Sequence, residues 1–158
     1  MVEEIVKNTR NYGYIEIDAP VDFVWKMVTQ FEDFTVDSKI HKVEFLTPDI
    51  RGVGQKTRWH FDLTTEDPKG VPTIQEEEII EWHPPDEDNT AYYTFKPLDG
   101  KMERFATYLI SPTAKGTFVA LVKYFPAGNP RLRGVGGTTT RQLRELKEVC
   151  EKEWKEQK

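Results

Sequence analysis

The C-terminal stretch, residues 129–158, places apolar and charged side chains on opposite faces of an α-helix. The apolar face consists of Leu132, Val135, Thr139, Leu143, Leu146, Cys150 and Trp154. An Asn-Pro pair at 129–130 is a helix start signal, whereas the glycines within 134–137 weaken the first turns. The helix therefore begins either near this pair or near Thr138. In both cases it needs an apolar surface to lie on.

The N-terminal part of the chain predicts a strand followed by helical segments. Apolar and polar side chains alternate over residues 12–18, which predicts a half-buried strand. Valines and a tryptophan spaced three and four apart predict a helix over residues 20–30, with proline at its first position. Phe31 and Phe34 lie three apart, which predicts a second short helix over residues 31–38.

The pattern then changes to short segments with period two, separated by Pro, Gly and Asp. Strands are predicted at residues 41–47, 53–63, 73–83, 90–96, 102–111 and 117–125. The clearest is 53–63, where Gln55, Thr57, Trp59, Phe61 and Leu63 share one face. Periodicity leaves the inward phase of the strands at 73–83, 102–111 and 117–125 open. Short turns favour an antiparallel meander, so residues 1–158 are predicted to form one α+β domain with helices on one face of a seven-stranded sheet.

Composition limits the classes of function. The chain has 158 residues, a net charge of -5 and no apolar run of the roughly 20 residues that a membrane span needs. The acidic balance argues against binding nucleic acid through its phosphates. One cysteine and an N-terminus without signal-peptide character predict a cytoplasmic protein.

Several phrases, in this order, resemble the helix-grip superfamily of START domains, Bet v 1 allergens and polyketide cyclases (SRPBCC proteins). They lie at residues 15–25 (IEIDAPVDFVW), 42–46 (KVEFL), 52–54 (GVG), 81–85 (EWHPP), 111–112 (SP), 116–117 (GT) and 143–147 (LRELK). The resemblance implies a curved seven-stranded antiparallel sheet, in the order β-α-α-β6-α, wrapped around the long C-terminal helix. It also implies an apolar cavity, in which members bind lipids, sterols, aromatic polyketides, hormones or quinones. Residues 35–38 differ from many cyclase-type relatives, which carry Trp or Pro there, and this weakens the transfer of a particular substrate.

The resemblance makes a set of apolar and aromatic side chains candidates for lining such a cavity. They are Phe34, Trp59, Phe61, Tyr93, Phe95, Tyr108, Val135, Thr139 and Leu143. The alternative is that these side chains simply fill the core. Tyr93 and Tyr108 are favoured as ligand contacts, because a buried phenol needs a hydrogen-bond partner that a ligand can supply.

Candidates for chemistry are few. Arg104 is in phase with Tyr108, so it either faces inward and anchors a carboxylate or enolate, or lies on the surface. Residues 76–78 are three glutamates that alternate across a strand, so an inward one is available as a base. We take Glu78 as that candidate; the alternatives are that the glutamate pairs with Arg or Lys or lies at an open end of the cavity. Tyr108 is the third candidate for catalysis, as a base.

The three histidines lack the spacing of metal ligands, and no cofactor is predicted. Cys150 faces the apolar side of its helix, where a buried thiol is expected. The principal hypothesis is binding or transport of a small hydrophobic ligand. The alternatives are a cyclase, aromatase or dehydratase acting in the same cavity, and a co-chaperone-like module whose protein partner cannot be named.

Overall fold

The computed structural model describes residues 8–62, 73–98, 105–126 and 135–157. Its elements are β1 (Asn8–Ile17), α2 (Val21–Thr29), the 3-10 turn η1 (Phe31–Asp33), β2 (Ile40–Phe45), β3 (Lys56–Phe61), β4 (Ile74–His83), β5 (Ala91–Pro97), β6 (Phe105–Pro112), β7 (Thr117–Pro126) and α3 (Val135–Glu156).

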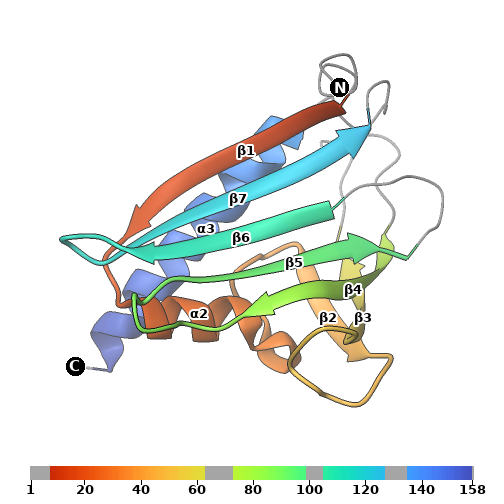
Figure 1. Cartoon of the computed structure of the whole chain (residues 1–158), viewed down its shortest axis with the longest axis horizontal. Helices are drawn as coiled ribbons and strands as arrows, with labels where there is room; N and C mark the ends of the chain where they lie inside the picture. The colour runs from red at the N-terminus through yellow and green to blue at the C-terminus, as the bar shows by residue number, and fades with distance from the viewer. Residues whose placement is uncertain (1–7, 63–72, 99–104, 127–134, 158) are drawn as a thin grey trace.

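The seven strands form one antiparallel sheet in the order β1-β7-β6-β5-β4-β3-β2. Strands β2 to β7 are a meander, and β1 closes the sheet by pairing with β7. Both helices cover the same face of the curved sheet, with α3 crossing behind β1 and β7 and α2 lying at one end (Figure 1). The predicted α+β fold class is therefore confirmed.

Several element boundaries differ from the prediction: β1 begins at Asn8, four residues before its predicted start, and two other differences have a local cause. The second helix is a single 3-10 turn, because the backbone leaves the helical region at Phe34 and two β-branched residues follow. Asp37 then holds the chain in a turn, accepting hydrogen bonds from the backbone N–H groups of Lys39 and Ile40. Strand β3 begins three residues later than predicted, because Gly54 has a φ of 94° that ends extended pairing.

Pairing registers settle which side chains face the helices. On β3 the predicted inward face is confirmed, since Thr57 and Trp59 are buried. For the strands whose inward phase periodicity left open, the structure gives the side chains that face the helices. They are Glu77 and Ile79 on β4, Ala106, Tyr108 and Ile110 on β6, and Val119, Leu121 and Lys123 on β7. A bulge between Ile79 and Glu81 then turns Trp82 inward against Tyr93.

Helix α3 lies closest to the sheet at β1. A Cβ atom at Gly13 would lie 2.9 Å from Cδ1 of Leu143 and 3.3 Å from Cγ2 of Thr139, so a larger residue here would require these side chains to shift. Lys147 donates to the carbonyl of Glu16 and anchors the helix further along the same strand. The helix is already formed at Val135, before the later of its two predicted starts.

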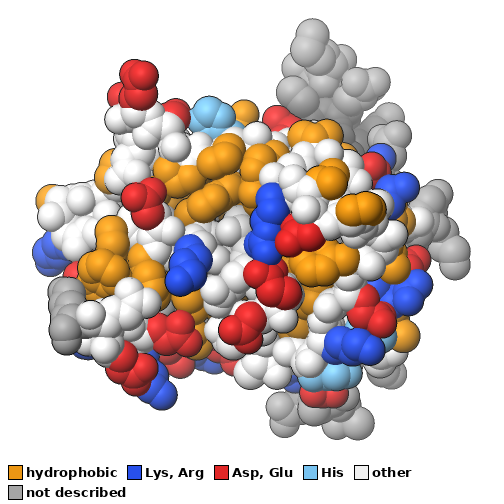
Figure 2. Space-filling model, turned by 90° about the horizontal axis from the view of Figure 1, so that it is seen from below, with side chains coloured by type: hydrophobic (Ala, Val, Ile, Leu, Met, Phe, Trp, Pro, Cys, Tyr) orange, Lys and Arg blue, Asp and Glu red, His pale blue; other side chains and the backbone are white. Residues whose placement is uncertain are grey.

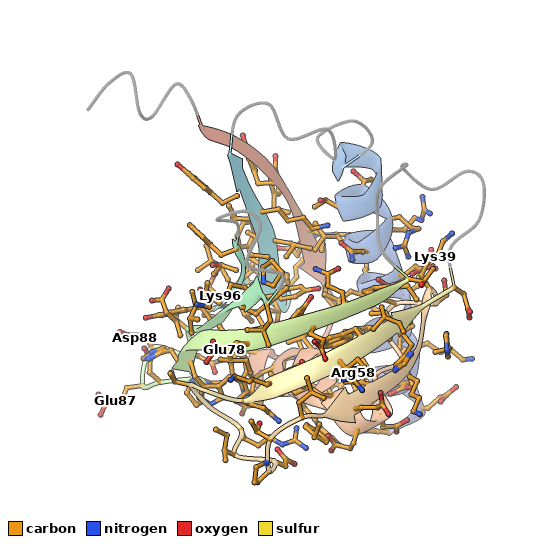
Figure 3. The ribbon with its side chains drawn as sticks, turned by 90° about the vertical axis from the view of Figure 1, so that its right-hand side faces the viewer. Lys39, Arg58, Glu78, Glu87, Asp88 and Lys96 are labelled. Atoms are coloured by element: carbon orange, nitrogen blue, oxygen red, sulfur yellow. The ribbon has the colours of Figure 1, made fainter. Side chains whose placement is uncertain are left out.

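The outer face of the sheet is charged over β2, β3, β4 and β5. Arg58 forms an ion pair of 2.8 Å with Glu76, and Lys96 lies 3.9 Å from Glu78 (Figure 3). Acidic, basic and hydrophobic side chains are intermixed on the face seen from below (Figure 2). None of the helices in the described ranges is both long and apolar enough to cross a membrane.

Candidate functional site

Aromatic side chains form a wall on the inner face of the sheet, at β3, β5 and β6. Tyr93 stacks on Tyr108 with ring centroids 5.4 Å apart, and Phe95 lies 5.8 Å from Tyr93. Trp59 is buried and receives the edge of Phe34 at 4.9 Å. Tyr108, Phe95, Phe34 and Phe61 are only half-buried although they lie in this inner layer. The structure thus brings all six predicted ring positions, including Phe34, into this inner layer.

The two favoured tyrosines have different hydroxyl environments. The Tyr93 hydroxyl donates to the carbonyl of Val28 at 3.2 Å, so α2 satisfies it. The Tyr108 hydroxyl makes no hydrogen bond to any residue in the described ranges. Burial raises the pKa of both phenols, which are therefore neutral near pH 7. Tyr108 is the tyrosine that retains a free hydrogen-bonding group.

Glu77 is a buried carboxyl group without a hydrogen-bond partner in the described part of the chain. Its neighbours Glu76 and Glu78 pair with Arg58 and Lys96 on the outer face, so strand alternation points Glu77 inward. Only 9% of Glu77 is exposed, and burial raises its pKa to about 8, against a smaller lowering by the charge of Lys123. The inward glutamate is therefore Glu77, and the candidate Glu78 lies on the opposite face.

Glu77 and Tyr108 each keep part of their surface exposed. Among the described residues, the one fully covered side-chain oxygen or nitrogen without a partner is Oε1 of Gln55. The Glu77 carboxyl and the Tyr108 hydroxyl also make no hydrogen bond within the described residues, and neither residue is completely covered, since Glu77 is 9% exposed and Tyr108 is half-buried. Buried polar groups are normally satisfied, and unsatisfied ones require an explanation.

Lys123 projects from β7 into the same layer. Its Nζ donates to Oε1 of Gln142 on α3 at 2.6 Å, and desolvation lowers its pKa to about 8. The charges of Asp37 and Glu77 raise this pKa, while that of Arg141 lowers it. A lysine and a glutamate on opposite sides of β5 and β6 therefore both titrate near pH 8.

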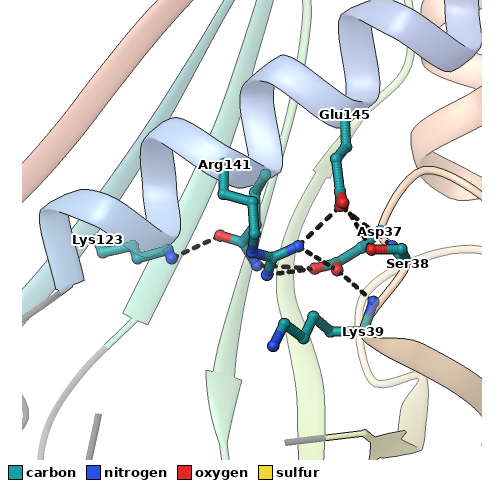
Figure 4. Close-up of polar contacts among 7 residues, drawn as sticks. Asp37, Ser38, Lys39, Lys123, Arg141 and Glu145 are labelled. Atoms are coloured by element: carbon teal, nitrogen blue, oxygen red, sulfur yellow. Dashed lines mark hydrogen bonds and ion pairs between the residues drawn. The ribbon is translucent and has the colours of Figure 1, made fainter. Parts of the chain in front are cut away.

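A polar clasp joins the loop before β2 to helix α3 (Figure 4). It consists of Asp37, Ser38, Arg141, Gln142 and Glu145. Arg141 binds Asp37 at 2.8 Å and Glu145 at 2.7 Å, and Gln142 donates to Asp37 at 3.2 Å. The hydroxyl of Ser38 donates to Glu145 at 2.6 Å. The clasp holds the loop against the helix beside Lys123.

The remaining predicted site residues fall into two groups. Thr139 and Leu143 are buried, and both pack where α3 meets Gly13 of β1. Arg104 and the side chain of Val135 lie outside the described residues, so their predicted contacts with a ligand remain predictions.

Sequence reasoning did not single out Glu77, Lys123, Asp37 or Arg141. The alternation of three glutamates showed that one must face inward but not which one. Lys123 is the one charged position in a strand whose other residues, apart from Thr117, are apolar or aromatic, and this signal was available in the sequence.

Other candidate groups are structural. Cys150 is buried as expected, and burial raises its thiol pKa to about 12, so it is a poor nucleophile. His60 lies on the outer face, 2.7 Å from Glu44. In the described ranges, no group of three or more His, Cys, Asp or Glu side chains is arranged to hold a metal ion.

Comparison with solved structures identifies the architecture. An aromatase/cyclase, Zhui, of a Streptomyces species superposes with a TM-score of 0.66 at 16% identity, covering 91% of this chain and 94% of its own. A STAR-related lipid transfer protein from Xanthomonas axonopodis gives 0.65 at 13% identity, with 88% and 84% covered. A Thermus thermophilus protein gives 0.62 at 20% identity, with 90% and 96% covered.

The chain has the helix-grip fold. This confirms the architecture that the sequence phrases implied. No family model and no curated protein matches the chain by sequence. At these identities the helix-grip likeness establishes the fold alone, so function must be argued from the site.

Proposed function

We propose that the protein binds a small hydrophobic, aromatic or lipid-like molecule in an internal cavity between the sheet and α3. The observation that carries this proposal is the pair of unpartnered groups, Glu77 and Tyr108. Both side chains face the inner layer without a hydrogen-bond partner among the described residues, and neither residue is completely covered. A filled core would cover these atoms or give them partners.

The composition of the wall supports the same proposal. Ligand sites are mostly apolar and aromatic, with a few placed polar groups. Rings from β3, β5 and β6 supply the apolar surface, and Glu77, Tyr108 and Lys123 supply the polar groups. The solved structures of the same fold include one lipid transfer protein and one aromatase/cyclase, which fits a ligand of this kind.

Ala106 provides a test, because its methyl group faces inward between Phe95 and Lys123. The Ala106→Phe variant is expected to bind 2-methylnaphthalene at least about tenfold more weakly than wild type, since its ring occupies the space of the ligand. Binding is followed by calorimetric titration. The control is Leu109→Phe on the outer face, where Leu109 is 41% exposed.

Unfolding of the same variants separates a cavity from a filled core. With a cavity, Ala106→Phe changes the free energy of unfolding by less than about 1 kcal/mol. In a filled core, overpacking costs about 1–3 kcal/mol. An absence of wild-type binding together with that loss of stability would contradict the proposal.

An enzyme of the cyclase or dehydratase type is the second candidate, favoured by Glu77. A carboxyl group with a pKa of about 8 can take up or give a proton near neutral pH, which is the property of a general acid or base. Conversion of an enolisable ketone by the wild type, abolished in Glu77→Gln, would favour the enzyme. Recovery of the ketone unchanged from both favours binding alone.

A further inference from the structure

Glu77 and Lys123 present unused hydrogen-bonding capacity to the same interior region. The Glu77 carboxyl makes no hydrogen bond within the described residues, and the Lys123 ammonium makes one, to Gln142. A lysine ammonium has three donors, so two remain available. The Tyr108 hydroxyl adds one donor and one acceptor. These groups come from β4, β6 and β7 and face the layer beneath α3.

The charges around these groups indicate which ligand group fits. Near pH 7 the buried Glu77 carboxyl mostly holds its proton, because its pKa is about 8. Lys123 and Arg141 carry positive charge, and Asp37 and Glu145 carry negative charge beside them. The region is therefore close to neutral as a whole. A neutral polar group suits it better than a carboxylate, whose desolvation would have no net positive charge to offset it.

We propose that Glu77, Lys123 and Tyr108 form a recognition site for a phenolic or enolic hydroxyl on an aromatic ligand, an inference that rests on the proposed function. The protonated Glu77 carboxyl accepts the ligand O–H at its carbonyl oxygen. The Lys123 ammonium, the Glu77 O–H and the Tyr108 O–H are the donors available to the ligand oxygen. Tyr93 faces the same region, but its hydroxyl is held by Val28, so it contributes its ring and no hydrogen bond.

Two probes of matched shape test this site at pH 7. An apolar cavity without polar partners favours 2-methylnaphthalene over 2-naphthol, because the naphthol hydroxyl loses its hydrogen bonds to water. The wild type is expected to reverse this order and bind 2-naphthol at least about tenfold more tightly. Glu77→Leu is expected to lose that preference, while Glu77→Gln keeps most of it because an amide also donates and accepts. Glu78→Gln, on the outer face, serves as the control.

The outcomes separate this inference from the proposed function. Equal or weaker wild-type binding of 2-naphthol, with 2-methylnaphthalene bound, overturns the hydroxyl site and leaves the cavity intact. Survival of the preference in Glu77→Leu, or tighter binding of 2-naphthoate than of 2-naphthol, also overturns the inference. Absence of binding of all three probes to the wild type contradicts the proposed function itself.

Discussion

Replacing Glu77 with leucine is expected to raise the free energy of unfolding by about 3–5 kcal/mol at pH 9 and to change it little at pH 4. Burial raises the carboxyl pKa from 4.5 to about 8 in the folded protein. Between these values the folded protein holds a proton that the unfolded chain has released, so wild-type stability falls as pH rises. Leucine has no proton to hold, and the difference between variant and wild type therefore grows from about pH 4.5 to pH 8.

Urea unfolding of both proteins at a series of pH values measures this difference. Glu78→Gln is the matched control, because Glu78 is the next residue but lies on the outer face near Lys96. Its stability is expected to follow the wild type within about 0.5 kcal/mol at each pH. A constant difference between Glu77→Leu and wild type across the series would show that Glu77 is not buried as described.

The Asp37→Ala variant is expected to lose about 3–5 kcal/mol of stability near pH 7. Asp37 is 4% exposed and accepts hydrogen bonds from Arg141, Gln142 and the N–H of Lys39. Removing its carboxylate leaves a partly buried guanidinium with only part of its compensating charge, and frees the loop from α3. Thermal and urea unfolding measure the loss.

Two further variants check this reading of the clasp. Asp88→Ala removes an exposed carboxylate from the β4–β5 turn and is expected to change stability by less than about 0.5 kcal/mol. Asp37→Ala combined with Arg141→Met is expected to recover part of the loss, because the guanidinium that lost Asp37 is also removed, while Glu145 keeps its hydrogen bonds from Ser38. Stability of Asp37→Ala within 1 kcal/mol of wild type would mean that the clasp contributes little to folding.

The fold was predictable from the sequence because the alternation of the strands, the one-faced C-terminal helix and the short turns all indicated the same architecture. Clean alternation around Trp59 predicted the inward face of β3, and the one-faced helix at the C-terminus predicted the surface that the sheet must provide. Short turns predicted the meander. The second helix was overpredicted because two phenylalanines three apart fit a helix, whereas Asp37 directs the local hydrogen bonds into a turn.

The polar part of the site was not predictable to the same degree, for a physical reason. The strand of Lys123 is apolar on both faces and the strand of Glu77 carries three consecutive glutamates, so neither sequence shows which side chain faces inward, and their orientation follows from register with neighbouring strands. The clasp joins residues about a hundred positions apart, from Asp37 to Arg141, which no local pattern encodes. The aromatic wall was predicted because ring-bearing residues two positions apart on a strand point to the same face of the sheet.

A crystal structure of the protein grown with 2-methylnaphthalene tests the central proposal most directly. We expect electron density for one naphthalene ring system between α3 and the rings of Phe95 and Tyr108, within reach of Glu77. A structure without such density, in which protein side chains cover the Tyr108 hydroxyl and the Glu77 carboxyl, would contradict it.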